Sequence, residues 1–219
     1  MSLRHWFQLA AASLAFATAG ALAQPFSPIT PAQPTEGNGK IEVIEFFWYG
    51  CPHCYSLEPS VVNFLKTAPK DVVFKRVHAL PSDSWAEHAK LFYTLETMGK
   101  LDEYHSKVFE AIHRSNLNLA NKKIRDDWLQ KNGIDPAKYA EVEKSFSVAT
   151  KMNRAKQLTY AYKVDSVPKV AVNGKFMTSG EQAGSVERVF PIVEQLIGMA
   201  RREAALPAKE GAAPKEKAS

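Results

Sequence analysis

The sequence predicts an α/β protein in which an all-helical segment interrupts a unit of strands and helices. Strong β-forming runs occur only near residues 41–48, 72–79 and 167–177, and residues 83–149 show helical spacing with no strand signal. Charged residues make up 23% of the chain and hydrophobic residues 45%, which excludes a disordered or collagen-like protein. The 219 residues therefore suit one globular domain that carries an insertion.

The first 23 residues have the three parts of a secretory signal peptide. Arg4 supplies a basic start, residues 6–22 are mostly apolar, and Ala-Leu-Ala at 21–23 has the small residues of a cleavage site. Polar residues dilute the apolar stretch, which favours cleavage over a retained membrane anchor. We therefore expect a mature chain that begins at Gln24 in an oxidising compartment, where cysteines can persist as disulfides.

The net charge gives little indication of a partner. It is +5, from 28 Lys and Arg against 23 Asp and Glu. Removal of Arg4 with the signal peptide leaves 27 − 23, or +4. Because this surplus is small, it favours neither a nucleic acid nor a membrane surface, and we expect no nucleic-acid binding.

The first elements of the mature chain form a strand, a helix and a strand. Prolines before residue 38 allow only a short edge strand around 26–29. Residues 41–48 read IEVIEFFW, a continuous β-rich run typical of a buried strand. Helical spacing then runs from 51 to 65, with a kink expected at Pro59. Since 72–79 is a second strand, this segment is predicted to be a parallel, right-handed βαβ unit.

Four helices are expected between residues 83 and 149, and the segments with helical spacing are 84–98, 101–112, 124–129 and 135–146. The first begins at a capping box, Ser84-Trp85-Ala86-Glu87. The fourth begins at Asp135-Pro136, an N-cap followed by proline, and its apolar face includes Phe146. We assign the apolar side chains Trp85, Phe92 and Leu95 to the core of this insertion.

Strand signals return at residues 167–177. An Asn173-Gly174 pair between β-formers predicts a hairpin there. A last helix covers roughly 185–202, and Pro191 either bends it or marks its true start. Residues 206–219 have no apolar face and are predicted to be a disordered tail.

The order of these elements predicts the fold. When the helical insertion at 83–149 is set aside, residues 24–82 and 150–205 have the order βαβ then ββα. This is the order of a thioredoxin-like fold, a central mixed β-sheet flanked by helices. The predicted fold class is therefore α/β, thioredoxin-like, with an all-helical insertion domain.

The only two cysteines of the chain, Cys51 and Cys54, lie where the buried strand meets the first turn of a helix. Unpaired backbone N–H groups and the helix dipole stabilise a thiolate at that position. His53, inside the same loop, adds a donor or a positive charge near Cys51. A disulfide whose reduced form is stabilised in this way is a strong oxidant, so the motif predicts redox chemistry.

Two alternatives to redox chemistry are weaker. A structural disulfide across so short a loop contributes only about 2 kcal/mol before strain, and it ties no distant segments together. A metal site needs further ligands, but there is no second cysteine pair, and the remaining candidates are dispersed along the sequence. These candidates are His78, His88, His105 and His113.

Four features occur together over residues 40–199. They are Glu45-Phe46-Phe47-Trp48-Tyr49-Gly50-Cys51-Pro52-His53-Cys54-Tyr55, the helical insertion, Val167-Pro168 and Val172-Asn173-Gly174-Lys175-Phe176. In this combination the sequence resembles the DsbA family of periplasmic thiol:disulfide oxidoreductases. The resemblance implies that Cys51 is the exposed sulfur that forms a mixed disulfide with substrate, and that Cys54 is its buried partner.

The resemblance also assigns roles around the cysteines. It implies that Pro52 and His53 tune the reduction potential. Val167-Pro168 is similar to the family's cis-proline loop, which lies against the sulfurs and offers backbone to an extended substrate. A trans proline at the start of a strand is the alternative.

Two acidic residues are candidates for tuning the site. Glu45 lies within an apolar strand, where a carboxylate needs a partner, and Glu58 lies on the helix that begins at the cysteines. In the family, acids at these matching positions lie near the buried cysteine and influence proton transfer. Simple exposure to solvent is the alternative for both, and either Lys75 or Arg76 is a plausible partner for the buried acid.

The resemblance implies a monomeric periplasmic dithiol oxidase whose partners are exported proteins with free cysteines. A DsbB-like membrane quinone reductase would reoxidise it, and the transfer itself needs no bound cofactor. Within redox chemistry the alternative is a disulfide isomerase or reductase, but related isomerases carry an N-terminal dimerisation domain for which residues 24–51 leave no room. A peptide-binding chaperone with incidental cysteines is the alternative from another class.

Overall fold

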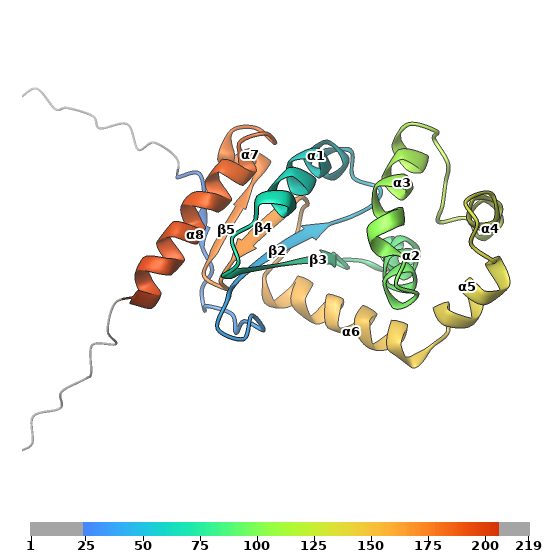
Figure 1. The fold of residues 1–219 in the computed structure, drawn as a ribbon, viewed down its shortest axis with the longest axis horizontal. Helices are drawn as coiled ribbons and strands as arrows, with labels where there is room; N and C mark the ends of the chain where they lie inside the picture. The colour runs from blue at the N-terminus through green and yellow to red at the C-terminus, as the bar shows by residue number, and fades with distance from the viewer. Residues whose placement is uncertain (1–23, 206–219) are drawn as a thin grey trace, which may run out of the picture.

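A computed structural model describes residues 24–205, so the predicted signal peptide at 1–23 and the predicted tail at 206–219 lie outside the described residues. The sheet has five strands in the order β1-β5-β4-β2-β3 (Figure 1). The strands are β1 Ser27–Pro28, β2 Ile41–Phe47, β3 Val72–His78, β4 Lys169–Val172 and β5 Phe176–Ser179. Strands β2 and β3 pair in parallel and the other pairs are antiparallel, so the predicted mixed sheet is confirmed.

The helices lie on both faces of this sheet and beyond one end of it (Figure 1). They are α1 Pro52–Thr67, the 3₁₀ turn η1 Asp83–Trp85, α2 Ala86–Thr97, α3 Leu101–His113, α4 Lys122–Lys131, α5 Pro136–Glu143, α6 Phe146–Ala161, α7 Gly180–Ala183 and α8 Val189–Ala205. Helices α1 and α8 share one hydrophobic cluster with the sheet, and α2 to α6 belong to the other. The fold is thus a thioredoxin-like sheet with helices α2 to α5 as an added helical layer. Within residues 24–205, no helix is both long and apolar enough to cross a bilayer.

Strand β2 is buried along its whole length, as its continuous apolar run predicts. Because successive side chains point to opposite faces, Val43 packs in the cluster with α1 and α8, and Phe46 packs in the cluster with α6. Its last residue, Phe47, contacts Phe92 of α2 and Phe109 of α3. The strand therefore ends against the helical layer, and the next residues of the chain begin the loop that carries the cysteines.

The predicted hairpin is confirmed, and the last helix, expected from about residue 185, begins at Val189. Asn173 and Gly174 both have positive φ, 52° and 65°, as a tight hairpin turn requires, and β4 pairs with β5 across them. Pro191 lies in the first turn of α8, where its missing N–H costs no hydrogen bond. It therefore marks the start of the helix.

The predicted capping box is wrong. Ser84 lies inside the 3₁₀ turn, and α2 begins after Trp85 without a side-chain cap. Glu87, which a capping box would direct back to Ser84, instead forms ion pairs with Lys90 at 2.6 Å and with Arg125 of α4 at 3.2 Å. Glu87 is therefore paired with basic side chains and is not available to cap the helix.

The fourth helix of the insertion is shorter than predicted. It ends at Glu143, and a new helix, α6, begins because the Ser145 hydroxyl accepts a hydrogen bond from the Val148 amide at 3.3 Å. Phe146 is 88% exposed at the start of α6, so its assignment to an apolar face is wrong. Since α6 continues to Ala161, the expected boundary between residues 149 and 150 falls inside a helix.

Candidate active site

Cys51 is the N-cap residue of α1, the place usually taken by Ser, Thr, Asp or Asn. Its Sγ accepts a hydrogen bond from the backbone amide of Cys54 at 3.4 Å. The Cys51 amide donates to the Trp48 carbonyl at 3.0 Å, which turns the chain from β2 into the helix. Pro52 follows at the first helical position, where no amide hydrogen is needed. The sequence thus directs one sulfur at the positive end of a helix.

The two thiols differ in burial and in acidity. Both are free, with 7% of Cys51 and none of Cys54 exposed, so the expectation of an exposed Cys51 is correct only relative to Cys54. Hydrogen bonding from Cys54, with help from His53, outweighs desolvation and lowers the pKa of Cys51 to about 6. Burial, together with its contact with the Cys51 sulfur, raises the pKa of Cys54 well above its usual value. At neutral pH the site therefore pairs a thiolate with a thiol.

A second segment of the chain closes the site. The Cys51 Sγ lies 3.4 Å from the carbonyl oxygen of Val167, and the Val167–Pro168 peptide bond is cis. Beside this loop is a cavity of about 410 Å³ that includes His53 in its lining. The remaining lining residues are small, polar or apolar side chains with one acid: Ser166, Val167, Pro168, Ser179, Gly180, Glu181, Ser185 and Val186.

Two buried carboxylates lie on the inner side of the site. Glu45 of β2 is 1% exposed and Glu58 of α1 is 6% exposed, so simple solvent exposure is wrong for both. Arg76 of β3 lies between them, with its Nη2 2.9 Å from Glu58 Oε1 and its Nε 3.4 Å from Glu45 Oε2. The Arg76 guanidinium is therefore shared as an ion-pair partner by both acids.

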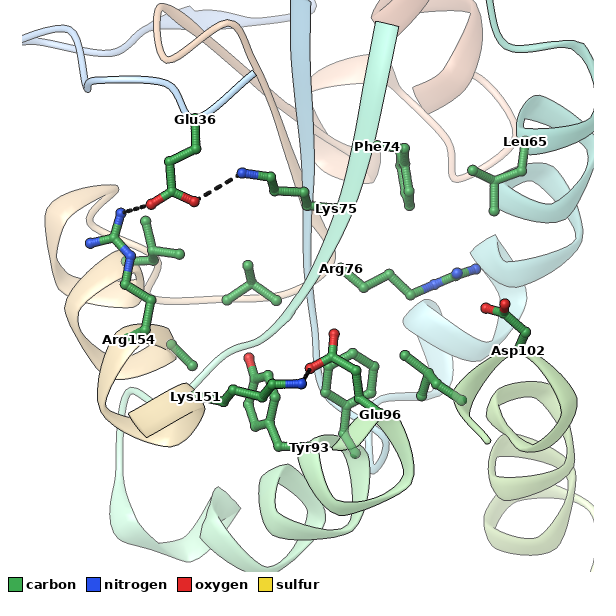
Figure 2. Close-up of a pocket in the computed structure, with 15 residues that line it drawn as sticks. Glu36, Leu65, Phe74, Lys75, Arg76, Tyr93, Glu96, Asp102, Lys151 and Arg154 are labelled. Carbon is green, nitrogen blue, oxygen red and sulfur yellow. Dashed lines mark hydrogen bonds and ion pairs between the residues drawn. The ribbon is translucent and has the colours of Figure 1, made fainter. Parts of the chain in front are cut away.

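The choice between Lys75 and Arg76 is settled by the alternation of side chains along β3. Figure 2 shows the two side chains leaving the strand in opposite directions, Lys75 toward Glu36 and Arg76 away from it. Lys75 Nζ lies 2.9 Å from Glu36 and 2.6 Å from Glu42, on the opposite face of the sheet from Glu45. Arg76 is thus the partner of the acids near the cysteines.

The two acids hold their protons differently. Burial, and the nearby charge of Glu58, raise the pKa of Glu45 to about 8 despite the attraction of Arg76. Burial also opposes ionisation of Glu58, but His105 and Arg76 outweigh it and lower its pKa. Glu45 lies close enough to Cys54 that ionisation of the acid raises the pKa of that thiol. At neutral pH the pair consists of a protonated Glu45 and an ionised Glu58.

Four histidines that are dispersed along the sequence gather in space around residues 47–49, and they are His78, His88, His105 and His113. Sequence reasoning missed this cluster. His105 lies four residues after Leu101 and four before Phe109, on the apolar face of α3, and that spacing was the available signal. Within residues 24–205, no group of three or more His, Cys, Asp or Glu side chains is placed to hold a metal ion.

An aromatic pair that the sequence did not predict borders the cysteine loop. Trp48 stacks on Trp85 with ring centroids 4.4 Å apart. Phe92 is fully buried, as predicted, but Trp85 is only partly buried. A Cβ on Gly50 would lie 2.4 Å from the Trp48 ring, so glycine is required for this packing.

Comparisons with known proteins agree with this geometry. Residues 42–186 match the family model described as "DSBA-like thioredoxin domain". The thiol:disulfide interchange protein DsbA of Pseudomonas aeruginosa is 41% identical over 178 residues, which are 81% of this chain and 82% of that protein. The protein of the same name from Bordetella parapertussis is 42% identical over 201 residues, 89% of this chain and 96% of the relative.

A solved structure has the same fold. The crystal structure of Pseudomonas aeruginosa DsbA superposes with a TM-score of 0.78 at 39% identity, covering 83% of this chain and 94% of that one. Together with the cysteine pair at the start of α1, these matches show that the chain belongs to the DsbA family and is a thiol:disulfide interchange protein.

Proposed function

We propose that the protein is a periplasmic dithiol oxidase that donates a Cys51–Cys54 disulfide to newly exported proteins. The observation that carries this proposal is the contrast between the two thiols. Cys51 caps α1 as a stabilised thiolate, and the buried Cys54 stays protonated. Because this contrast favours the reduced form, the disulfide is a good electron acceptor.

The transfer proceeds in two exchanges. A substrate thiolate attacks the Cys51 sulfur, the substrate–Cys51 bond forms, and the Cys51–Cys54 bond breaks with its electron pair passing to Cys54. A second substrate thiolate then attacks the first substrate sulfur, which completes the substrate disulfide and releases Cys51 as a thiolate. The substrate loses two electrons and the protein gains them. In the second exchange Cys51 is a better leaving group than an ordinary cysteine thiolate, because its pKa is about 6.

Glu45 supplies the proton that Cys54 needs in the first exchange. It is buried and has a pKa of about 8, so it carries a proton at neutral pH. When the electron pair reaches Cys54, the proton moves from Glu45 to the sulfur, and Arg76 offsets the charge left on Glu45. Glu58 tunes the same group through its shared contact with Arg76.

The substrate binds at the Val167–Pro168 loop. Proline at 168 has no amide hydrogen, and the Val167 carbonyl oxygen lies beside the reacting sulfur. An extended peptide can pair with the Val167 backbone in the manner of an added strand while its flanking side chain enters the adjacent cavity of about 410 Å³. Recognition through backbone accepts many sequences, which suits a broad set of unfolded substrates.

The remaining partners follow from the same chemistry. The reduced protein must return two electrons to an acceptor, and a DsbB-like membrane quinone reductase is the proposed one. Transfer between thiols and disulfides needs no resident cofactor on this chain. We propose that the protein acts as a monomer, with residues 1–23 serving as its cleaved export signal.

Two variants and the wild-type protein test the proposal, with a reduced, unfolded protein as the substrate for oxidation. Cys54→Ser, offered a peptide disulfide in place of the reduced substrate, is expected to trap a mixed disulfide at Cys51, with the other half of that disulfide released as a thiol. Cys51→Ser forms no mixed disulfide, and with the reduced substrate it loses oxidation while keeping its fold. Full activity of Cys51→Ser would instead support a chaperone that only binds peptides. Rapid repair of scrambled disulfides with little net oxidation by the wild-type protein would support an isomerase.

A further inference from the structure

His105 connects the helical layer to the buried acids. It lies on α3 and is 3% exposed. Its Nε2 is 3.4 Å from Glu58 Oε2, and its Nδ1 is 2.8 Å from the hydroxyl of Tyr49. Tyr49 is itself fully buried, two residues before Cys51. The imidazole thus bridges the carboxylate of α1 and the loop that leads to the cysteines.

The partners of His105 determine which ring nitrogen carries the proton. Burial raises the pKa of Tyr49 well above its usual value, so the phenol is protonated and donates to Nδ1. The proton on the ring then lies on Nε2 and faces Glu58, which is the stronger acceptor when it is ionised. Burial lowers the pKa of His105, so the ring is neutral at pH 7. A neutral donor therefore favours the ionised form of Glu58 without adding a charge.

The imidazole makes the surroundings of the two acids that share Arg76 unequal. Both acids contact the guanidinium, at 3.4 Å for Glu45 and 2.9 Å for Glu58. Among the described residues, Arg76 is the one ion-pair partner of Glu45, whereas Glu58 has Arg76 and also His105. The second donor decides which carboxylate is ionised, because two buried carboxylates cannot both ionise cheaply beside one cation.

We infer that His105 is a positioning residue that fixes the negative charge on Glu58 and so leaves the exchangeable proton on Glu45, beside Cys54. This inference rests on the proposed oxidase function only in its consequence for the exchange. Acting through Glu58 and Arg76, the imidazole keeps on Glu45 the proton that Cys54 receives when the disulfide opens. It never touches the reacting sulfurs.

Charged and titratable groups from several elements face this imidazole, and all of them enter its pH dependence. They are Glu58 of α1, Arg76 of β3, Tyr49 before α1, His78 at the end of β3 and Asp102 on the same helix. A cavity of about 320 Å³ is lined by Glu58, Arg76 and His105 together with Asp102, Lys66 and Ser106. Of the two acids, Glu58 thus lines a cavity, and Glu45, which does not line it, holds the proton.

His105 also has a packing role that an experiment must separate. Its ring lies edge-on to Phe47 at 5.1 Å and to Phe109 at 5.2 Å. His105→Phe keeps an aromatic ring there and removes both polar contacts, the one with Tyr49 and the one with Glu58. His105→Gln places an amide N–H where Nε2 faces Glu58. His105→Asn has a shorter side chain and keeps only the contact with Tyr49. Asn and Gln are the matched pair, since each retains one of the two contacts.

The direct measurement is the pH titration of the Glu45 and Glu58 carboxyl carbons by NMR in oxidised protein with ¹³C-labelled glutamate. Glu45→Gln and Glu58→Gln variants assign the two signals. We expect His105→Phe and His105→Asn to lower the midpoint of Glu45 and raise that of Glu58, each by about one pH unit. His105→Gln should restore the wild-type order.

The kinetic readout is the pH dependence of mixed-disulfide formation between oxidised enzyme and a small thiol. The alkaline limb of the profile, where Glu45 loses its proton, should move down by about one pH unit in His105→Phe and His105→Asn but not in His105→Gln. Equal shifts in Asn and Gln, or an unchanged Glu45 midpoint in His105→Phe, would overturn the inference. Loss of thiol exchange by Cys51→Ser tests the oxidase function separately, because the NMR midpoints do not depend on it.

Discussion

The Cys51 Sγ and the Val167 carbonyl oxygen lie 3.4 Å apart although 116 residues separate them in the chain. The helical insertion lies between these two segments in sequence, yet β2 and β4 pair directly in the sheet. The loop after β2 and the loop before β4 therefore meet at the same end of the two paired strands. The redox pair and the peptide-binding backbone come from different segments and are joined by the sheet.

The acidity of Cys51 predicts the pH profile of its alkylation. With its pKa at about 6, the reduced protein should react with iodoacetamide at Cys51 with a midpoint near pH 6, far below that of an ordinary cysteine. Cys54 should remain unmodified because it is fully buried. Mass spectrometry of the alkylated protein measures both, with Cys54→Ser as the control. A midpoint near pH 8.5 would contradict the stabilised thiolate.

The same acidity predicts how reduction changes stability. The folded pKa of Cys51, about 6, lies below its reference value of 9.0, so the reduced protein gains stability as the pH rises from 6 to 9 and loses that gain as the pH falls through 6. The oxidised protein has no such group. At pH 9 the free energy of unfolding of the oxidised form should be up to about 4 kcal/mol lower than that of the reduced form.

Denaturant unfolding of both redox forms across this pH range checks that prediction. Reduced Cys51→Ala should show no such gain. A difference between the redox forms that stays constant from pH 6 to 9, or an oxidised form that is the more stable at pH 9, is the contrary result.

Removing the cation between the buried acids should be costly. Arg76→Met leaves the ionised Glu58 buried without a cation beside it, and we expect a loss of about 3 to 5 kcal/mol of folding free energy at pH 7. Lys75→Met is the matched control, since Lys75 is the neighbouring base but is 30% exposed and pairs on the other face. Urea unfolding compares the two. Equal losses would show that Arg76 has no special role.

Glu45 should make the oxidised protein less stable as the pH rises. Its folded pKa of about 8 lies above the reference value of 4.5, so folding retains a proton that the unfolded chain has released. The buried histidines are neutral when folded, and the protons that the unfolded chain loses from them near pH 6.5 affect the wild-type protein and Glu45→Gln equally. Between pH 6.5 and 8 the wild-type protein should therefore lose about 2 kcal/mol relative to Glu45→Gln. Parallel curves for the two proteins would show that Glu45 is ionised when folded.

Much of the fold could be predicted because its signals are local. The apolar run at 41–48, the Asn173-Gly174 turn and Asp135 before Pro136 each specify a backbone conformation from a few neighbouring residues. The capping box at Ser84 was also a local signal, but Glu87 found partners in Lys90 and Arg125 instead. The capping pattern failed because other charged side chains competed for the same carboxylate.

The candidate site could be predicted only in part, because only some of its residues are placed by local signals. The position of Cys51 at a helix start follows from the order of strand, cysteines and helix. The selection of Arg76 over Lys75 depends on which face of β3 each side chain occupies relative to Glu45, and this requires the strand register. His105 joins the site through packing of α3 against α1, a contact with no trace in nearby sequence.

The equilibrium reduction potential of the Cys51–Cys54 pair tests the central claim most directly. If the stabilised Cys51 thiolate makes this protein a disulfide donor, the potential, measured against glutathione, should lie near the value of about −120 mV known for DsbA itself. A potential near the value of about −270 mV known for thioredoxin would contradict the oxidase assignment, because such a pair would accept a disulfide from its substrates.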